Sequence, residues 1–380
     1  MARGVGRRGR RGPAPVVLTI FCVRPPNLNI GNDAIFLGVR HLLREAFGET
    51  FNLVQVPAVQ RGGQDELGGL LPKTIHQMNL YGHGVIVGGG NLYENGQLDV
   101  DVHALGGLRL PLMLFSLSHG RIYDHRHQLI SRTDAMPAQT VVALNHHAAV
   151  SVVRDDATLE HLRALGVTAA VIGGCPSLFL SRLQPMPSPR PVVAGGTLLS
   201  LRHPQLTSIP LRDQARLHAA IMRLIEVVES EGFGPVRILC HDTRDLPFAL
   251  SFGDLECIVP DDVYSYLELL RQARLVVSFR LHAFVPCLSF GTPAINISYD
   301  ERSRSLVRTL GFESWDIDFV RAPDVVADVR GRCARLHEFA DLRRRAQPCW
   351  RRLEDVMHGA MSSFASLVTA YAAEGPSYAP

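Results

Sequence analysis

The chain has 380 residues, with 39 Lys+Arg against 36 Asp+Glu and 46% hydrophobic side chains. This length predicts two domains, since domains usually contain about 100–200 residues. The hydrophobic fraction excludes a largely disordered or fibrous chain. A formal net charge of +3 is too small to indicate nucleic acid as the main partner. Lys73 is the only lysine, so arginine supplies nearly all of the positive charge.

The seven cysteines are scattered along the chain and never lie in CxxC spacing. They therefore predict neither a disulfide framework nor a thiolate metal site, and we expect a reducing, cytoplasmic environment. Residues 1–14 form a basic, glycine-rich leader that we expect to be disordered. No apolar run approaches the ~20 residues of a membrane span, but the basic leader leaves open a peripheral location at the inner face of the membrane.

The first part of the chain alternates between strand and helix patterns. Residues 16–22 predict a buried strand, and the polar loop LNIGND leads from it into an amphipathic helix that Gly48 ends. A later strand starts at residue 150 and leads into a helix that Asp155 or Asp156 can cap. The other strands expected here are residues 51–56, 84–87, 110–117, 140–144 and 169–172.

The proline-rich segment 185–191 predicts a linker. A second series of strands and helices follows it. The strands expected there are residues 192–201, 236–240, 275–279 and 294–298, and the helices are 213–231, 261–273 and one from about His282.

Strands that alternate with helices predict parallel sheets covered on both faces. We therefore expect an α/β protein with two Rossmann-like domains, residues 15–184 and residues 192–345, that face a cleft. The carboxyl ends of the strands would line that cleft. Residues 346–380 predict a C-terminal helix and tail that could pack back on the N-terminal domain.

Four strand-to-loop junctions carry residues that suit a ligand site. At the first, Asn29, Gly31, Asn32 and Asp33 lie between a strand and a helix. Glycine lets the backbone approach a ligand, and the free N–H groups of a helix N-terminus favour an anion. The alternative, which this junction by itself favours, is that Asn32 or Asp33 merely caps the helix.

A run of glycines marks the second junction. Gly88, Gly89 and Gly90 follow a buried strand and precede Asn91. Such a run suits a phosphate cradle, but it matches neither GxGxxG nor a P-loop. A tight turn explains it equally well.

The third and fourth junctions each place an arginine close to a histidine. Arg202 follows the first strand after the linker, and Ser278, Arg280, Leu281 and His282 follow a later strand. The arginine fork matches a carboxylate or a phosphate, and histidine can transfer a proton near neutral pH. The alternative is a structural ion pair between Arg280 and a carboxylate of the other domain.

These segments resemble one protein family. NIGNDAIFLG, VIVGGGNLYE, CPSLFL, LSLRHP and SFRLHAFVPCLSFGTPAINISYDERSRSL are similar to segments of the polysaccharide pyruvyl transferase family, from about residue 29 to residue 311. The resemblance implies a glycosyltransferase-B-like fold and transfer of the enolpyruvyl group of phosphoenolpyruvate to hydroxyls of a sugar or glycoside. The products would be a pyruvate ketal and free phosphate, and no metal or other cofactor is expected.

The resemblance implies a donor site in the C-terminal domain. Arg280 and Arg202 would bind the anionic groups of phosphoenolpyruvate, and Ser278 and Leu281 would lie beside them. His282 would be the acid/base of the reaction or a ligand of the phosphate.

The acceptor side is expected in the N-terminal domain, where Asp33 would orient a hydroxyl. The residues expected to line the cleft there are Asn29, Gly31, Asn32, Gly89, Gly90 and Asn91. The chain departs from the family here: Gly-Asn replaces the more usual Gly-Asp, the run YDER lacks the usual lysine, and LFSLSHGRIYDH lacks a glycine-rich stretch. These departures leave open a small glycoside or natural product as the acceptor.

Two other functions stay open at this point. One is a nucleotide-sugar glycosyltransferase, because a fold does not fix a function. Asp261, Asp262 and Glu268 are available for ribose binding, but they read more simply as a helix start and a solvated face. The other is a non-catalytic subunit of a biosynthetic complex. The sequence indicates no particular oligomeric state.

Overall fold

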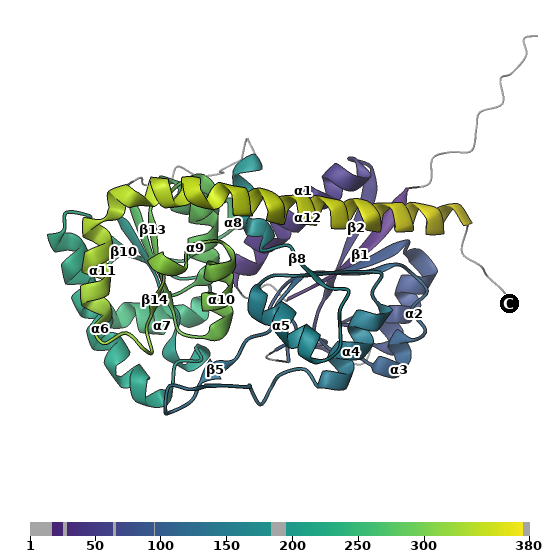
Figure 1. Cartoon of the computed structure of the whole chain (residues 1–380), viewed down its shortest axis with the longest axis horizontal. Coiled ribbons are helices and arrows are strands. Elements are labelled where there is room, and N and C mark those ends of the chain that lie inside the picture. Colours follow the sequence, from purple (N-terminus) through teal and green to yellow (C-terminus); the bar gives the residue numbers. More distant parts are fainter. Residues whose placement is uncertain (1–16, 26–28, 64–65, 95, 184–194, 375–380) are drawn as a thin grey trace, which may run out of the picture.

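The structure, a computed structural model, describes residues 17–25, 29–63, 66–94, 96–183 and 195–374. Two lobes, each built on a six-stranded sheet, lie side by side, and one long helix runs along both (Figure 1). We call the residues before and after the gap at 184–194 the N-terminal and C-terminal lobes. The expected leader 1–14 and linker 185–191 lie outside the described residues.

The N-terminal lobe holds a parallel sheet with the strand order β2-β1-β3-β4-β7-β8. Its inner strands are mostly apolar and largely buried, as expected for a sheet covered on both faces. The strands are β1 (Leu18–Arg24), β2 (Phe51–Pro57), β3 (Gly84–Gly90), β4 (Leu112–Leu117), β7 (Val150–Val153) and β8 (Val171–Ile172). The helices are α1 (Ile30–Phe47), α2 (Pro72–Tyr81), α3 (Val102–Leu105), α4 (Ala138–His147) and α5 (Asp156–Ala164).

The C-terminal lobe repeats the arrangement with the order β11-β10-β9-β12-β13-β14. Its strands are β9 (Thr197–Ser200), β10 (Val236–Leu239), β11 (Cys257–Ile258), β12 (Leu275–Ser278), β13 (Ala294–Ser298) and β14 (Ile317–Asp318). Its helices are α6 (Leu211–Ser230), α7 (Leu246–Ala249), α8 (Val263–Gln272), α9 (Leu281–Phe290), α10 (Glu301–Thr309), α11 (Val325–Ala334) and α12 (Phe339–Glu374). The expected pair of Rossmann-like α/β units is therefore confirmed.

In both sheets the strand order reverses at the first strand of the lobe. β1 lies between β2 and β3, and β9 lies between β10 and β12. In such sheets the loops on either side of the reversal diverge, and they leave a crevice at the carboxyl ends of the strands. The four junctions singled out in the sequence follow β1, β3, β9 and β12, so the fold brings all four to these crevices.

One predicted element is wrong in kind. Residues 140–144 are not a strand but part of helix α4. The run TVVAL looks β-like, yet the buried residues of α4 are Val141, Leu144 and Asn145, whose spacing of three and four residues is helical. Strand β3 is longer than expected, because it continues through the glycine run to Gly90.

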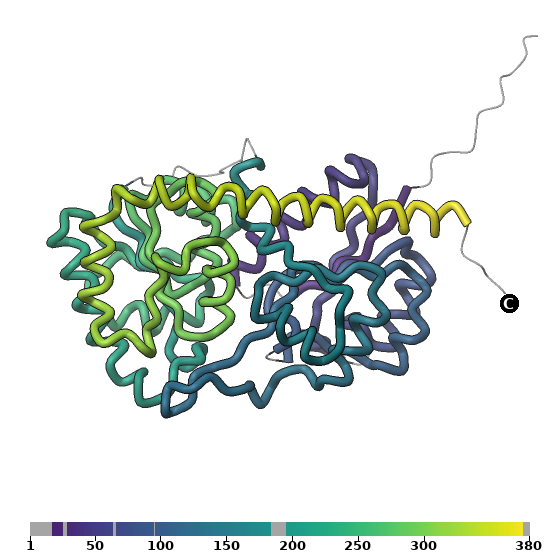
Figure 2. The backbone as a smooth tube through the Cα atoms, viewed as in Figure 1, coloured from purple at the N-terminus to yellow at the C-terminus, as the bar shows by residue number. Residues whose placement is uncertain are grey.

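Helix α12 packs against both lobes (Figure 2). In the C-terminal lobe its Trp350 ring stacks on Phe312 at 6.0 Å. In the N-terminal lobe its Phe364 meets Phe47 edge-on, also at 6.0 Å. The helix continues past Pro348, so the domain boundary expected between residues 345 and 346 falls inside it. No helix in the described part of the chain has an apolar stretch long enough to cross a membrane.

A short hairpin forms a second connection between the lobes. Strands β5 (Ile122–Tyr123) and β6 (Leu129–Ile130) belong to the N-terminal lobe, but the hairpin docks on the C-terminal lobe (Figure 1). The Arg121 guanidinium and backbone pair with Glu301 at the start of α10. The Tyr123 hydroxyl donates to Asp318 at 2.5 Å. The hairpin therefore fixes the C-terminal lobe relative to the N-terminal lobe beside the start of α10.

The packing of α12 can be tested with one substitution. Phe364→Ala should lower the free energy of unfolding by about 3–5 kcal/mol, because it removes a fully buried ring that joins α12 to the N-terminal lobe. Denaturant unfolding of the full chain measures this change. Leu367→Ala on the same helix is the control, since Leu367 is 41% exposed and should change stability by about 0.5 kcal/mol or less. Equal effects would contradict the packing described.

Candidate active site

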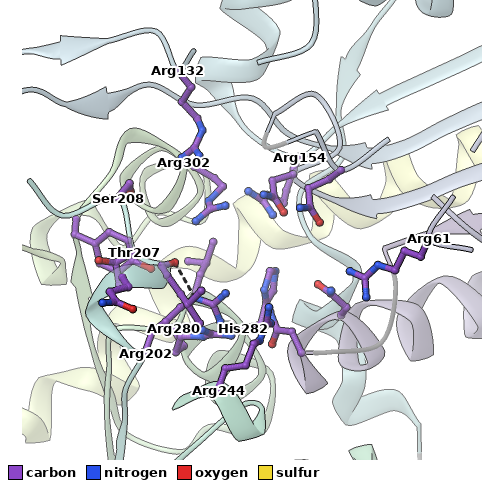
Figure 3. A pocket seen from close by; sticks show the side chains of 18 residues that line it. Arg61, Arg132, Arg154, Arg202, Thr207, Ser208, Arg244, Arg280, His282 and Arg302 are labelled. Carbon is purple, nitrogen blue, oxygen red and sulfur yellow. Dashed lines mark hydrogen bonds between the residues drawn. The ribbon is translucent and has the colours of Figure 1, made fainter. Parts of the chain in front are cut away.

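A polar cavity of about 310 Å³ lies at the crevices of both sheets (Figure 3). Both lobes contribute to it, from loops that follow β1, β2, β3, β6, β7, β9, β10, β12 and β13. Its lining is strongly basic, and it contains no Asp or Glu among the described residues. The arginines that line it are Arg61, Arg132, Arg154, Arg202, Arg244, Arg280 and Arg302.

The cavity brings together more than half of the predicted site residues. From the N-terminal lobe come three amide side chains, and from the C-terminal lobe come residues that were expected to bind the donor. The predicted residues that line the cavity are Asn29, Asn32, Asn91, Arg202, Arg280, Leu281 and His282. Residues separated by as many as 250 positions in the sequence therefore share one site, as a cleft between two Rossmann-like lobes requires.

Three other predicted residues support the site without lining it. A Cβ atom on Gly31 would lie 2.8 Å from the Cβ of His282, so the glycine lets α1 approach α9. At Gly89, with φ +69°, a Cβ would lie 2.3 Å from Ile35, which supports the tight-turn interpretation of the glycine run. The Ser278 hydroxyl donates to the Arg280 carbonyl (2.7 Å) and accepts from its N–H (2.9 Å).

The predicted roles of Asp33 and Gly90 find no support in the cavity. Asp33 does not line it, because the carboxylate pairs with Arg24 at 2.5 Å. Gly90 ends β3 and also lies outside the lining. The first loop reaches the cavity with Asn29, whose side chain accepts from the N–H of Gly31 and caps α1. The amide side chains of this loop, Asn29 and Asn32, line the cavity, and the carboxylate of Asp33 does not.

Four cationic or titratable side chains in the cavity have buried nitrogen atoms without a hydrogen-bond partner among the described residues. They are Arg154 (Nε and Nη2), Arg202 (Nη1), Arg280 (Nη1) and His282 (Nε2). Arg154 is 1% exposed and Arg280 is 6% exposed. Burying a charge is costly unless it is paired or hydrogen-bonded. Four such groups around one cavity are typical of a site built for an anion.

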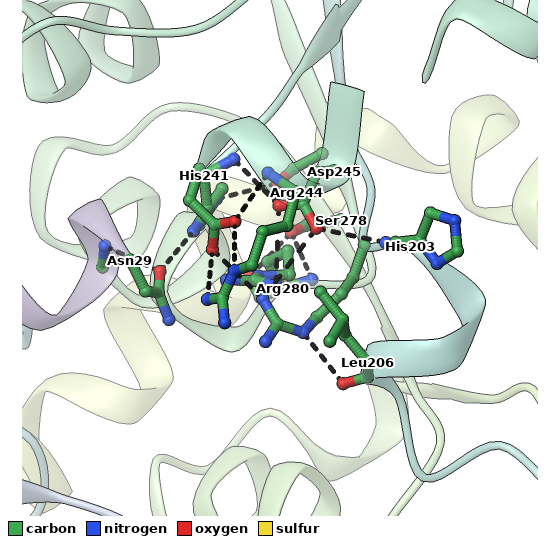
Figure 4. A network of polar contacts seen from close by, with 12 residues as sticks. Asn29, His203, Leu206, His241, Arg244, Asp245, Ser278 and Arg280 are labelled. Carbon is green, nitrogen blue, oxygen red and sulfur yellow. Dashed lines mark hydrogen bonds and ion pairs between the residues drawn. The ribbon is translucent and has the colours of Figure 1, made fainter. Parts of the chain in front are cut away.

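Asp245 lies close to two of these arginines, Arg280 and Arg202. Figure 4 shows it near Arg280. Its buried carboxylate accepts from the backbone N–H groups of His203 (3.1 Å) and His241 (3.2 Å). It lies 3.8 Å from the Nη1 of Arg280 and 3.9 Å from the Nη1 of Arg202. At these distances the carboxylate attracts both guanidinium groups without forming a hydrogen bond to them. It therefore helps to hold them in place while the Nη1 atom of each forms no hydrogen bond among the described residues. The Nε of Arg202 donates to the Leu206 carbonyl at 2.9 Å, and its Nη1 lies 3.5 Å from Asp242.

Burial and the crowded positive charge lower the pKa values of two side chains in the cavity. Burial, and then the Arg280 charge, lower the pKa of Arg202 to about 10, so this side chain is still cationic at neutral pH. Burial also lowers the pKa of His282 well below its usual range, and Arg154, Arg302 and Arg280 lower it further. His282 is therefore a neutral imidazole at neutral pH when no anion is bound.

His241 is a second neutral histidine behind the first. Burial and then the neighbouring Arg280 lower its pKa well below the usual range. Its Nε2 bonds to the Ser200 hydroxyl at 2.9 Å, and its ring packs edge-on against Tyr266. The Tyr266 hydroxyl donates to the carbonyl of His282 at 2.6 Å. This network fixes the start of α9, and hence the position of His282.

Sequence reasoning missed five of the lining arginines. They are Arg61, Arg132, Arg154, Arg244 and Arg302. A signal existed for Arg154, since it follows the apolar strand β7 as Arg280 follows β12. The segment that contains Arg154 also predicts the start of a helix, and Asp155 does cap that helix. Loops that become neighbours only on folding supply most of the others.

The residues considered for a nucleotide-sugar site do not line the cavity. Asp262 caps α8 through its bonds to the N–H groups of Tyr264 and Ser265. Glu268 is buried rather than solvated, and it pairs with Arg271. Among the described residues, no group of three or more His, Cys, Asp or Glu side chains is arranged to hold a metal ion.

The fold is similar to that of solved UDP-N-acetylglucosamine 2-epimerases. The enzyme from Rickettsia bellii is 14% identical, with a TM-score of 0.55 over 96% of this chain and 98% of that chain. The Neisseria meningitidis enzyme bound to UDP-GlcNAc is 11% identical, with a TM-score of 0.55 and coverage of 94% and 100%. At such low identity these likenesses show the fold alone, which is glycosyltransferase-B-like as expected.

Sequence comparisons identify the family. The amylovoran biosynthesis protein AmsJ of Erwinia amylovora is 24% identical over 207 residues, which are 47% of this chain and 50% of AmsJ. The chain thus spans about half the length of the curated relative it matches. The family model for polysaccharide pyruvyl transferase matches residues 29–301, which run from the first cavity residue almost to the last. Because this match covers well over half of the sequence, the chain belongs to the polysaccharide pyruvyl transferase family.

Proposed function

We propose that the protein transfers the enolpyruvyl group of phosphoenolpyruvate to two hydroxyls of a sugar or glycoside, forming a pyruvate ketal and releasing phosphate. Membership of the family supports this reaction. The observation that carries the proposal is the set of buried nitrogen atoms of Arg154, Arg202, Arg280 and His282 around one cavity that have no hydrogen-bond partner among the described residues. Such a set matches a compact donor with two anionic groups.

The donor's charge compensates the charge of the site. Phosphoenolpyruvate carries about −1.5 to −2 on its phosphate near neutral pH, and its carboxylate adds another negative charge. Arg202 and Arg280 bind these groups from the C-terminal lobe, beside the N-terminus of α9, where free N–H groups favour an anion. Arg154 binds from the N-terminal lobe. A donor held from both lobes has its central carbon in the cleft, where an acceptor can reach it.

The reaction balances without a redox partner. A proton adds to the methylene carbon of the donor, which becomes a methyl group. Two acceptor hydroxyl oxygens form bonds to the central carbon, and the bond from that carbon to the phosphate oxygen breaks. The two hydroxyls lose two protons. One of them balances the proton that the methyl group gains. The other leaves with the phosphate.

We assign the proton transfer to His282. In the free protein the ring is neutral, because burial and three arginines oppose its positive charge. The bound donor brings negative charge beside those arginines and so raises the pKa of His282. The imidazolium formed in this way can protonate the methylene carbon, and the neutral ring left behind can then accept a hydroxyl proton.

The acceptor hydroxyls meet amides instead of the expected acidic residue. Asp33 is engaged by Arg24 and lies outside the cavity lining. Asn29, Asn32 and Asn91 line the cavity from the N-terminal lobe. Each amide offers both a donor and an acceptor to a sugar hydroxyl.

Ligand-induced stabilisation separates this proposal from the nucleotide-sugar alternative. Phosphoenolpyruvate should raise the melting temperature of the full chain, because a ligand at one hundred times its Kd adds about 2.7 kcal/mol of stability. Differential scanning fluorimetry with phosphoenolpyruvate and, separately, a panel of nucleotide sugars measures the shift. Stabilisation by a nucleotide sugar alone would favour a glycosyltransferase, and stabilisation by neither would favour a non-catalytic subunit.

The role of His282 predicts a loss of turnover without a loss of donor binding. His282→Gln keeps a polar group near Nε2 but cannot carry a transferable proton, so phosphate release should fall about 10²–10⁴-fold. A phosphate-release assay measures turnover, and thermal stabilisation by phosphoenolpyruvate checks that the variant still binds the donor. Near-normal turnover in this variant would remove His282 from the chemistry.

Proton uptake on donor binding tests the coupling between charge and protonation. Because the pKa of His282 is low in the free protein and rises with the donor bound, binding should take up a proton, increasingly as the pH falls from about 8 to 6. Titration calorimetry in two buffers of different ionisation enthalpy counts the protons. Subtracting the value for His282→Gln removes the contribution of the donor's own phosphate. No difference between wild type and variant would contradict the coupling.

A further inference from the structure

We infer that the acceptor sugar carries an anionic group of its own, a phosphate, diphosphate or carboxylate, and that Arg61 and Arg132 select for it. The inference rests on the proposed function, because it concerns the second substrate of the same site. Four of the seven arginines that line the cavity are not needed to bind the donor.

Donor binding accounts for only part of the positive charge in the cavity. Arg154, Arg202 and Arg280 are the arginines whose buried nitrogen atoms in the cavity have no hydrogen-bond partner among the described residues, although carboxylates lie 3.5–3.9 Å away. Three guanidinium forks are enough for one phosphate and one carboxylate, since each fork can bind two oxygen atoms. Four further arginines line the same space, and each needs another explanation.

Three of these four are engaged by carboxylates of the protein, and for two of them the carboxylates are largely buried. Arg244 donates to both oxygens of Asp242, each at 2.8 Å. Arg302 donates to Asp300 at 3.0 Å and lies 3.3 Å from Glu94. Their charge is compensated inside the fold, so they are structural elements of the cavity wall.

Arg61 and Arg132 are different, and both belong to the N-terminal lobe. Arg61 is exposed and forms no hydrogen bond or ion pair with any described residue. Arg132 is fixed by a fork to Asp134 at 2.8 and 2.9 Å, through its Nε and Nη2 atoms. The Asp134 side chain is 48% exposed, so water screens much of its charge. In Figure 3 Arg132 lies at the top of the view, near Arg302, and Arg61 points toward the cavity from the right.

The rest of the lining suits an anionic sugar better than a neutral one. Arginine has five N–H donors and no acceptor, so the seven arginines of the wall can bind oxygen atoms of a ligand but cannot accept a hydrogen bond from a sugar hydroxyl. The amide and hydroxyl side chains of the wall can do that. No carboxylate lines the described part of the cavity, and Tyr299 is its one aromatic residue there. Anionic oxygen atoms only accept hydrogen bonds, so they match this wall. A cleft of one sign also concentrates ligands of the opposite sign.

The test measures sugar binding to protein whose donor site is already occupied. Full-length protein is saturated with phospholactate, which has the phosphate and carboxylate of phosphoenolpyruvate but lacks the double bond. Calorimetry then compares methyl galactoside, galacturonic acid, galactose 1-phosphate and UDP-galactose, and the matching glucose series. We expect an anionic member to bind at least about tenfold more tightly than its neutral counterpart at low salt. The preference should weaken as salt rises, because exposed charges are screened.

Variants connect this preference to the two arginines. Arg61→Ala/Arg132→Ala should abolish the preference for the anionic sugar and leave binding of the neutral sugar unchanged. Arg351→Ala, an exposed arginine of α12 outside the cavity lining, is the control and should keep the preference. If the double variant does not fold, Arg61→Ala alone decides, since Arg61 has no structural partner among the described residues. The best anionic sugar shows whether phosphate or carboxylate is the recognised group.

Two outcomes overturn the inference: no anionic sugar binds more tightly than its neutral counterpart, or the double variant keeps the preference. Binding of phospholactate is measured first, and it tests the proposed donor site separately from the acceptor. If phospholactate does not bind, the donor assignment fails, and the same sugar titrations on the free protein still decide whether Arg61 and Arg132 select an anion.

Discussion

Burying a guanidinium group costs free energy unless a partner compensates its charge, and this protein buries several around one cavity. Arg154 and Arg280 are almost completely removed from solvent, and their nearest carboxylates lie 3.5 and 3.8 Å away. These carboxylates attract the guanidinium groups without a hydrogen bond to their buried nitrogen atoms, so the positive charge between the lobes is only partly compensated. That charge favours an anionic ligand, and it adds to burial, the larger cause, in lowering the pKa of His282.

The fold maintains this unfavourable arrangement through rigid supports. Asp245 receives two backbone N–H groups and stays close to the donor-side arginines. Tyr266 and His241 fix the start of α9. Between the lobes, Asp155 accepts from the Ser305 hydroxyl of α10 at 3.2 Å. Together with α12 and the β5–β6 hairpin, these contacts hold two half-sites at a constant distance, so the arginines cannot move apart to relieve their repulsion.

The hairpin also gives a structural reason for a departure noted in the sequence. The segment LFSLSHGRIYDH lacks the glycine-rich stretch that the family resemblance led us to expect. In the structure this part of the chain leaves β4, and its Arg121 and Tyr123 contact the C-terminal lobe beside α10. The contact lies next to Tyr299 and Arg302 of the cavity wall. This segment thus contributes to the contact between the lobes.

Local patterns were sufficient for the alternation of strands and helices, the two parallel sheets and the donor-side residues. Arg202, Arg280 and His282 follow apolar strands directly, and residues at the carboxyl ends of parallel strands meet at one edge. The same reasoning failed at residues 140–144, where a short apolar run fits both a strand and a helix and only packing decides. It also placed Asp33 in the site, because the sequence does not show that Arg24 engages it.

The sequence by itself determined the fold class and the motif-bearing half of the site, since both depend on neighbours along the chain. Only the tertiary structure decided which side chains share the cavity and which charges stay unpaired. Arg61, Arg132 and Arg154 come from three separate loops of the N-terminal lobe. Their effect on a ligand depends on distances across the cleft, which exist only when the two lobes are packed together.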